Sequence, residues 1–218
     1  MLNRQELAAL IDHTLLKPEA VEGDIEKLCM ETLEYGFASA CVNSLWVEKA
    51  AGLLVGSPSL VCSVIGFPLG ASAAMPEETE KAVSMGADEL DMVIPVGLLK
   101  GGNLKSAEDT VRQVVDAAGG APVKVILETC LLTDDEKKTG CGIAMEAGAS
   151  WVKTSTGFGS AGATEADVRL MKAVVGDRLG VKASGGIRSL EDALSMIRAG
   201  ASRLGCSRGV SILESLQD

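Results

Sequence analysis

Residues 149–159 read Ala-Ser-Trp-Val-Lys-Thr-Ser-Thr-Gly-Phe-Gly. Trp151–Val152 predicts the end of a short buried strand, with Lys153 at its C-terminal tip and a loop of small residues after it. Thr164, followed three residues later by Asp167, predicts the N-terminus of the next helix. A strand, a loop and a helix in this order form one β-then-α unit, and the rest of the chain repeats that unit.

Short apolar runs alternate with helix patterns along the whole chain, without a linker or a low-complexity segment. Such runs are typical of parallel strands covered on both faces. The predicted strands are Ile11–Leu15, Ala38–Val42, Leu60–Ile65, Glu89–Ile94, Val123–Glu128, Ser150–Lys153, Gly180–Ala183 and Ser202–Gly205. The predicted helices are Ile25–Tyr35, Ser44–Leu54, Pro76–Met85, Leu104–Ala118, Asp134–Ala147, Glu165–Val175, Leu190–Ala199 and Gly209–Leu216. Eight units predict one α/β domain over residues 1–218, a single-domain (β/α)8 TIM barrel. A doubly wound open sheet is the second possibility, weakened because no Gly-x-Gly-x-x-Gly follows the first strand.

An internal repeat supports the barrel. Four predicted helices end at a glycine that fits a left-handed cap. These glycines are Gly36, Gly86, Gly148 and Gly200. The residues five positions later are Cys41, Asp91, Lys153 and Gly205. They fall on strands 2, 4, 6 and 8, and alternate strands fill one interior layer of such a barrel. The repeat therefore predicts these four residues at one height inside the barrel, near its C-terminal mouth.

Composition limits the partners and the location of the protein. The 218 residues carry a formal net charge of −10, which argues against nucleic acid and anionic membranes as partners. A small anionic ligand stays possible, because a local group of amides and lysines can outweigh the global charge. No stretch is apolar for the length of a membrane span, and the N-terminus lacks the apolar run of a signal peptide. We therefore expect a cytoplasmic protein.

The cysteines do not form a metal-binding pattern. Six of them are scattered through the chain, no pair has Cys-x-x-Cys spacing, and His13 is the single histidine. This arrangement predicts reduced thiols and no metal site.

Lys153 is unusual because it stands among apolar residues at a strand end. An ammonium loses hydration there, which lowers the pKa of the lysine, and a neutral amine attacks carbonyl carbons. Lys182 ends the next strand, and repulsion between the two cations is expected to lower the pKa of one of them. Asp91 can pair with the lysine that stays charged. The set suits imine formation followed by proton transfer. The alternatives are a Lys153 that reaches solvent or pairs with a carboxylate, and a structural Asp91–Lys182 ion pair.

Glycine- and serine-rich loops after the last three strands predict a phosphate site. Barrels of this class often hold phosphate on backbone amides after strands 7 and 8, at the start of a helix. Tight turns alone would also explain any one loop. The residues predicted to bind substrate in these loops are Thr156, Gly157, Gly185, Gly186, Ser207 and Arg208, together with Cys41 and Gly205 of the interior layer.

The first strand is polar in the middle of an apolar run. Asp12 and Thr14 are two residues apart and share a face, where they are expected to bond substrate hydroxyls. His13 then faces the helices and is predicted to be structural. Glu128 and Asn43, at other strand ends, are weaker candidates of the same sort.

These residues resemble the deoxyribose-phosphate aldolases, a family of class I, Schiff-base aldolases, nearly from end to end. The matching motifs are Ile11-Asp12-His13-Thr14-Leu15-Leu16, Ala40-Cys41-Val42-Asn43, Val64-Ile65-Gly66-Phe67-Pro68-Leu69-Gly70, Gly86-Ala87-Asp88-Glu89-Leu90-Asp91, Lys124-Val125-Ile126-Leu127-Glu128-Thr129, Val152-Lys153-Thr154-Ser155-Thr156-Gly157-Phe158 and Val181-Lys182-Ala183-Ser184-Gly185-Gly186-Ile187-Arg188. The resemblance implies Lys153 as the imine-forming lysine, with Lys182 and Asp91 as its pKa partner and proton relay. It implies cleavage of 2-deoxyribose 5-phosphate to acetaldehyde and glyceraldehyde 3-phosphate, without metal or organic cofactor, by a homodimer or larger homo-oligomer.

The chain departs from the family in three places. Phe158 stands where some members have a phosphate-binding lysine, and Arg208 stands where the family more often has a small residue. Some members end in a tyrosine-bearing tail, whereas the only tyrosine here is Tyr35. Two rival functions stay open at this point. One is a sugar-phosphate isomerase that uses Asp91 as base, and the other is a non-enzymatic sugar-phosphate binder.

Overall fold

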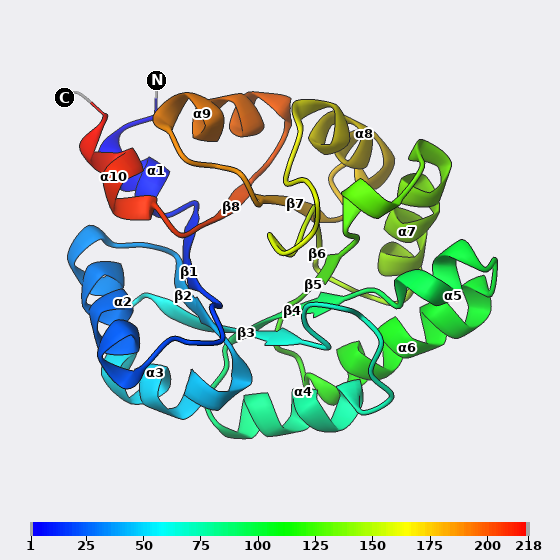
Figure 1. Ribbon diagram of the computed structural model, residues 1–218, viewed down its shortest axis with the longest axis horizontal. Coiled ribbons are helices and arrows are strands. Elements are labelled where there is room, and N and C mark those ends of the chain that lie inside the picture. The colour runs from blue at the N-terminus through cyan, green and yellow to red at the C-terminus, as the bar shows by residue number, and fades with distance from the viewer. Residues whose placement is uncertain (1, 217–218) are drawn as a thin grey trace.

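Eight parallel strands close into a barrel in the order β1 to β8, surrounded by helices (Figure 1). The structure is a computed structural model that describes residues 2–216. The strands are β1 Ile11–Leu15, β2 Ser39–Val42, β3 Leu60–Ile65, β4 Glu89–Val93, β5 Val123–Ile126, β6 Trp151–Lys153, β7 Gly180–Ser184 and β8 Arg203–Cys206. The helices are α1 Arg4–Ala8, α2 Glu22–Tyr35, α3 Val47–Leu54, α4 Met75–Ser84, α5 Val96–Lys100, α6 Leu104–Ala117, α7 Asp134–Glu146, α8 Glu165–Val175, α9 Leu190–Ala199 and α10 Gly209–Glu214.

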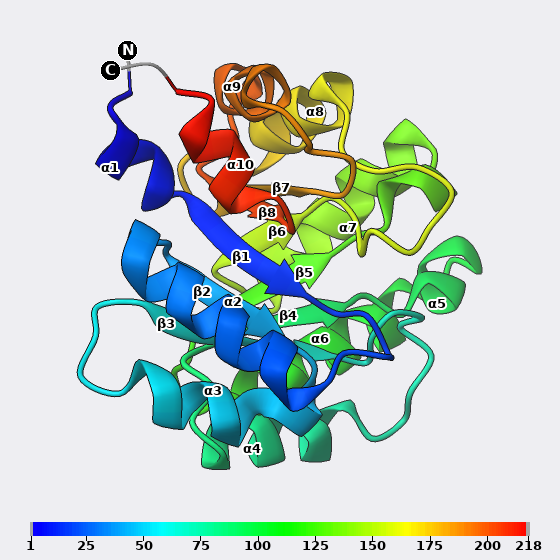
Figure 2. The same ribbon diagram turned by 60° about the vertical axis from the view of Figure 1, so that its left-hand side comes forward.

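Closure of the barrel decides between the two predicted folds. The first strand pairs with β2, where Asp12 lies opposite Ser39, and also with β8, where Asp12 lies opposite Gly205. An open sheet has two edge strands, each unpaired on one side, whereas here the first strand pairs with the last and all eight strands form one closed ring. The barrel prediction is therefore confirmed and the open sheet is wrong. Figure 2 shows β1 beside α2, and the first and last helices, α1 and α10, side by side.

The predicted helices are all present, and their starts follow from the caps. Thr133 and Ser189 form capping boxes with Glu136 and Asp192, and the Thr164 hydroxyl accepts the Asp167 N–H. Two five-residue helices, α1 and α5, were not predicted because each is barely longer than a single turn. For α1 the signal was present, because Asn3 and Glu6 form a capping box.

The fifth strand ends earlier than predicted. It stops at Ile126, whereas the apolar run predicted a strand to Glu128. Glu128 has φ 55° and ψ 64°, a left-handed conformation that cannot continue an extended strand. A 3-10 turn, Thr129–Leu131, follows at once.

Apolar side chains pack between the strands and the helices, and polar ones fill the barrel. Leu90 and Met92 are buried in the outer core, and Asp91 between them is buried inside the barrel. His13 faces the helices as predicted: its Nε2 lies 2.7 Å from Glu31 Oε2, and its ring lies 4.9 Å from that of Phe37.

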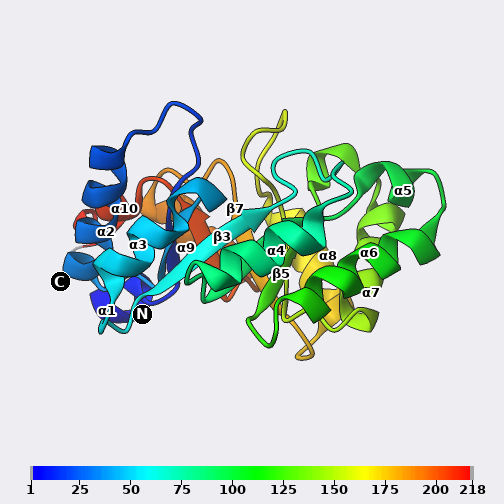
Figure 3. The same ribbon diagram turned by 90° about the horizontal axis from the view of Figure 1, so that it is seen from below.

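The loops after β1, β3 and β6 rise from the same end of the barrel, which is the C-terminal end of the strands (Figure 3). Active sites of (β/α)8 barrels are built at this end. Within residues 2–216, no helix is both long enough and apolar enough to cross a bilayer.

Candidate active site

Asp91 lies at the centre of a buried ion cluster. Its Oδ2 is 2.7 Å from Lys153 Nζ and 2.6 Å from Lys182 Nζ, and its Oδ1 is 3.1 Å from Lys124 Nζ. The carboxylate and all three lysines are buried inside the barrel. The structure therefore brings together the three residues that the sequence singled out, from β4, β6 and β7.

The cluster continues toward the N-terminal end of the barrel. Lys182 is 2.5 Å from Asp12, Lys124 is 2.7 Å from Glu89, and Arg203 is 2.7 Å from Asp12 and 3.4 Å from Glu89. Sequence reasoning missed Lys124, Glu89 and Arg203. The signal was available, because Glu89 and Arg203 stand two residues before Asp91 and Gly205, and a period of two keeps the same face of a strand.

Lys153 differs from the other cations of this cluster. The four cationic side chains share three carboxylates, and Lys124, Lys182 and Arg203 each contact two of them. Among the described residues Lys153 contacts one, Asp91. The cluster thus contains one more cation than carboxylates, and Lys153 is the cation held by the fewest ion pairs.

The carboxylates fix the charge of Lys182. Burial opposes the ammonium form, but Asp12 and Asp91 outweigh it and hold the pKa of Lys182 well above its usual range. Burial likewise opposes the carboxylate form of Asp91. The Lys124, Lys153 and Lys182 ammonium groups outweigh that effect and hold the pKa of Asp91 well below its usual range. Repulsion between lysines, the effect expected from sequence, is therefore not what decides the charge of Lys182.

A cavity of about 310 Å³ opens at the C-terminal mouth, and Lys153 lines its wall. Of the predicted substrate-binding residues, the wall contains Thr14, Thr156, Gly157, Gly185, Gly186, Gly205, Ser207 and Arg208. Lys17 and Arg188 also line the cavity, and sequence reasoning did not single them out. Both are exposed and lie in loops after β1 and β7, so their charge is available to an anion. The Phe158 side chain, 52% exposed, packs edge-on against Phe67 with ring centroids 5.3 Å apart.

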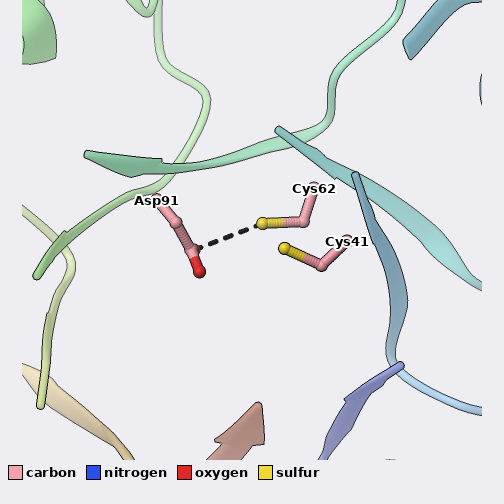
Figure 4. Close-up of side chains that lie close together, drawn as sticks. All are labelled: Cys41, Cys62 and Asp91. Atoms are coloured by element: carbon pink, nitrogen blue, oxygen red, sulfur yellow. Dashed lines mark hydrogen bonds between the residues drawn. The ribbon is translucent and has the colours of Figure 1, made fainter. Parts of the chain in front are cut away.

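Asp12 and Cys41 lie inside the barrel as predicted, but neither lines the cavity wall, so their contact with substrate stays a prediction. Asp12 is fully buried and held by Lys182, Arg203 and the Ser39 hydroxyl, which donates to it at 2.8 Å. Cys41 is fully buried beside Cys62 (Figure 4). The alternation of side chains along a strand correctly predicts that both residues face the inside of the barrel. It does not predict that ion pairs and packed side chains separate them from the cavity.

Cys41, Cys62 and Asp91 present three donor atoms within 4.8 Å of one another (Figure 4). The donor set does not suit a metal ion. Asp91 already binds three ammonium groups, which repel a cation. Burial raises the pKa of the Cys62 thiol well above its usual range, so this ligand is a neutral thiol.

The glycines of the mouth bring the loops close together. A Cβ on Gly205 would lie 3.0 Å from Lys182 Cε, so glycine there makes room for the lysine. Gly185 has φ 83°, which favours glycine, and a Cβ on it would lie 3.0 Å from Gly162 Cα and 3.4 Å from Gly157 Cα. The loops after β6 and β7 therefore border the same cavity.

The family model described as the DeoC/LacD family aldolase matches residues 7–215. The chain belongs to this family. Deoxyribose-phosphate aldolase from Lysinibacillus sphaericus is 55% identical over 215 residues, covering 97% of this chain and 96% of that protein. Its counterpart from Streptococcus suis is 55% identical over 214 residues, covering 97% of each.

Solved structures of family members have the same fold. The tetrameric deoxyribose phosphate aldolase from Aeropyrum pernix is 38% identical, with a TM-score of 0.92 and coverage of 98% of this chain and 92% of that one. An aldolase named QR15 is 40% identical, also with a TM-score of 0.92, and covers 98% and 96%. This chain is thus an aldolase of the lyase class.

Proposed function

We propose that this chain cleaves 2-deoxy-D-ribose 5-phosphate to acetaldehyde and D-glyceraldehyde 3-phosphate, reversibly, through an imine on Lys153. One observation carries the role of Lys153. It is the cation of the cluster that contacts a single carboxylate, and it is also the one that lines the cavity. A lysine amine beside a substrate cavity, held by a single carboxylate, is placed for nucleophilic attack on a carbonyl.

The reaction runs through an enamine. Lys153 Nζ adds to C1 of the open-chain sugar, and loss of water gives the iminium. The C2–C3 bond then breaks as the C3 hydroxyl loses its proton, which releases glyceraldehyde 3-phosphate and leaves the electron pair in the enamine. Protonation of C2 and addition of water release acetaldehyde and restore the amine.

Asp91 and Lys182 support these steps. Asp91 contacts both Lys153 and Lys182, so the three groups form one hydrogen-bonded chain. Its carboxylate stabilises the positive charge of the iminium. Lys182 stays an ammonium and is a proton donor to the chain that ends at Lys153.

Phosphate is proposed to bind at the opposite end of the cavity from the ion cluster. Backbone amides near Gly185, Gly186 and Ser207 offer neutral donors, and Lys17, Arg188 and Arg208 offer positive charge. Some family members have a phosphate-binding lysine at the position of Phe158, and in this chain Lys17 and Arg188 supply that positive charge instead. Thr14, Thr156 and Gly157 line the space between, where the sugar hydroxyls lie.

An isomerase that uses Asp91 as its base is less well supported. Three ammonium groups hold the pKa of this carboxyl well below its usual range, against the effect of burial, and such a group is a weak base. A simple sugar-phosphate binder has no use for three buried lysines and a half-buried arginine around three carboxylates. The test is product analysis with 2-deoxyribose 5-phosphate. Release of acetaldehyde supports the lyase, and a phosphorylated isomer without acetaldehyde supports the isomerase.

We also propose a cytoplasmic homodimer or larger homo-oligomer, acting on a small phosphorylated sugar. The six free cysteines fit a reducing compartment, and the Aeropyrum pernix relative is named as a tetramer. Light scattering of the purified protein measures the number of subunits.

A further inference from the structure

Glu128 is a strained and buried residue at the mouth of the barrel. It lies between β5 and the turn that follows, and 4% of it is exposed. Within residues 2–216 it is the one non-glycine residue with positive φ. Residues with a side chain adopt this conformation rarely, and such positions cluster at functional sites. The conformation of Glu128 is thus typical of a residue at a functional site.

No cation lies within ion-pair distance of Glu128 in the described part of the chain. Every other buried carboxylate there has one: Asp12 and Asp91 contact Lys182, Glu89 contacts Lys124, and Asp167 contacts Lys137 at 2.6 Å. A buried carboxylate without a counter-ion is unfavourable unless hydrogen bonds compensate for lost hydration. The hydrogen bonds that Glu128 accepts therefore indicate its role.

Most of those hydrogen bonds come from Thr156, and the Cys130 thiol adds a long one, with its Sγ 3.8 Å from Glu128 Oε1. The Thr156 hydroxyl donates a short hydrogen bond to Glu128 Oε2, and the Thr156 N–H lies 3.4 Å from both carboxylate oxygens. The Phe158 N–H donates to the same hydroxyl oxygen at 3.0 Å. A hydroxyl has one proton and two lone pairs. The Thr156 hydroxyl uses its proton in the bond to Glu128 and one lone pair in the bond from the Phe158 N–H. One lone pair of Thr156 Oγ1 is therefore left for another donor.

That remaining lone pair belongs to a residue of the cavity wall. Thr156 lines the cavity together with Lys153, three residues earlier, and Gly157, which borders the predicted phosphate loop. Thr156 therefore lies between the imine lysine and the phosphate end. A sugar phosphate that spans this distance places its middle hydroxyls beside Thr156.

We infer that Glu128 is a positioning residue: it holds the Thr156 hydroxyl so that Oγ1 accepts a hydrogen bond from a hydroxyl of the bound sugar. This rests on the proposed function, and it assigns a role to a residue that does not itself line the cavity. An acceptor fixed in this way favours sugars that carry a hydroxyl between the carbonyl and the phosphate.

A purely structural role is the competing explanation. The loop of residues 154–159 packs on Glu128, since a Cβ on Gly159 would lie 3.2 Å from its carboxylate. If Glu128 only held this loop, its loss would also disturb Lys153. If Glu128 acts through Thr156, removing Glu128 has little further effect in a variant that already lacks the Thr156 hydroxyl. A double-mutant cycle separates the two.

The variants are Glu128→Gly, Glu128→Gln, Thr156→Val and the double variant that combines Glu128→Gly with Thr156→Val. Glycine removes the carboxylate and adopts the left-handed backbone conformation easily, so the substitution introduces no backbone strain at this position. Glutamine keeps an acceptor oxygen for the hydroxyl. Valine keeps the shape of threonine without the hydroxyl. Each is assayed for kcat/KM with 2-deoxyribose 5-phosphate, and for exchange of the acetaldehyde methyl protons in D2O.

We expect Glu128→Gly and Thr156→Val each to lower kcat/KM by about tenfold or more, the effect of one hydrogen bond. The double variant should lose less than about threefold beyond Thr156→Val, and Glu128→Gln should stay within about threefold of the natural chain. Exchange with acetaldehyde should be unchanged in all of them, because acetaldehyde has no hydroxyl to donate.

Three results would overturn the inference. They are a Glu128→Gly enzyme with full cleavage activity, losses that multiply in the double variant, and a loss of acetaldehyde exchange that matches the loss of cleavage. Failure of the proposed function looks different. In that case the natural chain itself would show neither exchange nor cleavage, and the role of Glu128 would fall with it.

Discussion

Lys153 Nζ lies 2.7 Å from Asp91 Oδ2, its one carboxylate contact in the described chain, and on the wall of the cavity. The neighbouring lysine, Lys182, has two carboxylate contacts, at 2.5 and 2.6 Å, and does not line the cavity. Two lysines on adjacent strands, opposite each other in register, are thus placed in different electrostatic surroundings. One is suited to be the nucleophile and the other to stay charged.

Asp91→Asn should both inactivate and destabilise the protein. The substitution leaves three buried ammonium groups without their shared carboxylate, and breaking a buried pair costs about 3–5 kcal/mol. Urea denaturation measures the free energy of unfolding, and an acetaldehyde-release assay measures activity. An Asp91→Asn protein that is as stable as the natural one would show that the cluster does not depend on this carboxylate.

The exposed cationic residues of the cavity, Lys17, Arg188 and Arg208, should affect only the binding of the phosphate group. One hydrogen bond to a charged group contributes about 1.5–3 kcal/mol, so Arg208→Ala or Arg188→Ala should raise KM for the phosphorylated sugar about tenfold. Unphosphorylated deoxyribose should be nearly unaffected. The matched control is Arg198→Ala, which removes an arginine of α9 that does not line the cavity. Equal changes for both sugars would indicate a general structural effect.

Buried thiols should make the protein less stable at high pH. Burial raises the pKa of Cys141 to about 12, from an unfolded value of 9.0. The folded state then holds a proton that the unfolded state has lost, so this thiol lowers the stability as pH rises from 9 toward 12. Over this range the Cys141 thiol lowers the free energy of unfolding by about 1.4 kcal/mol per pH unit.

Cys141→Ala isolates that share. Under reducing conditions, its free energy of unfolding should fall with pH less steeply than that of the natural chain above about pH 9. Below about pH 8 the difference between the two proteins should be constant. Parallel curves over the whole range would mean that the folded thiol ionises as readily as the unfolded one.

Chelation should leave activity intact. Two groups of thiols and carboxylates come closest to a metal site. One contains Asp91, which binds three ammonium groups, and the other contains Asp12 and Glu89, which bind Lys182, Lys124 and Arg203, so cations already occupy the carboxylates of both. The measurement is the cleavage rate before and after exhaustive dialysis against EDTA. A loss that zinc or magnesium restores would place the protein in a metal-dependent class.

Periodicity and glycine spacing predicted the fold and the centre of the site. The four repeated glycines placed Asp91 and Lys153 inside the barrel, and the structure joins them at 2.7 Å. Such spacing works because the strand period is two and the helix caps fix where each strand starts. It also placed Cys41 inside, and the structure buries it there.

Tertiary contacts decided what spacing alone did not. Asp12 faces inward as predicted, but Arg203, far away in sequence, covers it from β8. Glu128 looked like the end of a strand, because an apolar run does not reveal a left-handed residue. Lys17 and Arg188 stand in loops whose course over the cavity depends on the packing of the whole mouth.

The most direct measurement is reductive trapping. The protein is incubated with acetaldehyde and borohydride, digested, and the adduct is located by mass spectrometry. We expect one stable adduct, on Lys153, and none in Lys153→Leu, which should keep its fold and lose cleavage. An adduct on Lys182 alone, or no adduct in a protein that still cleaves the sugar phosphate, would contradict the assignment of Lys153 as the nucleophile.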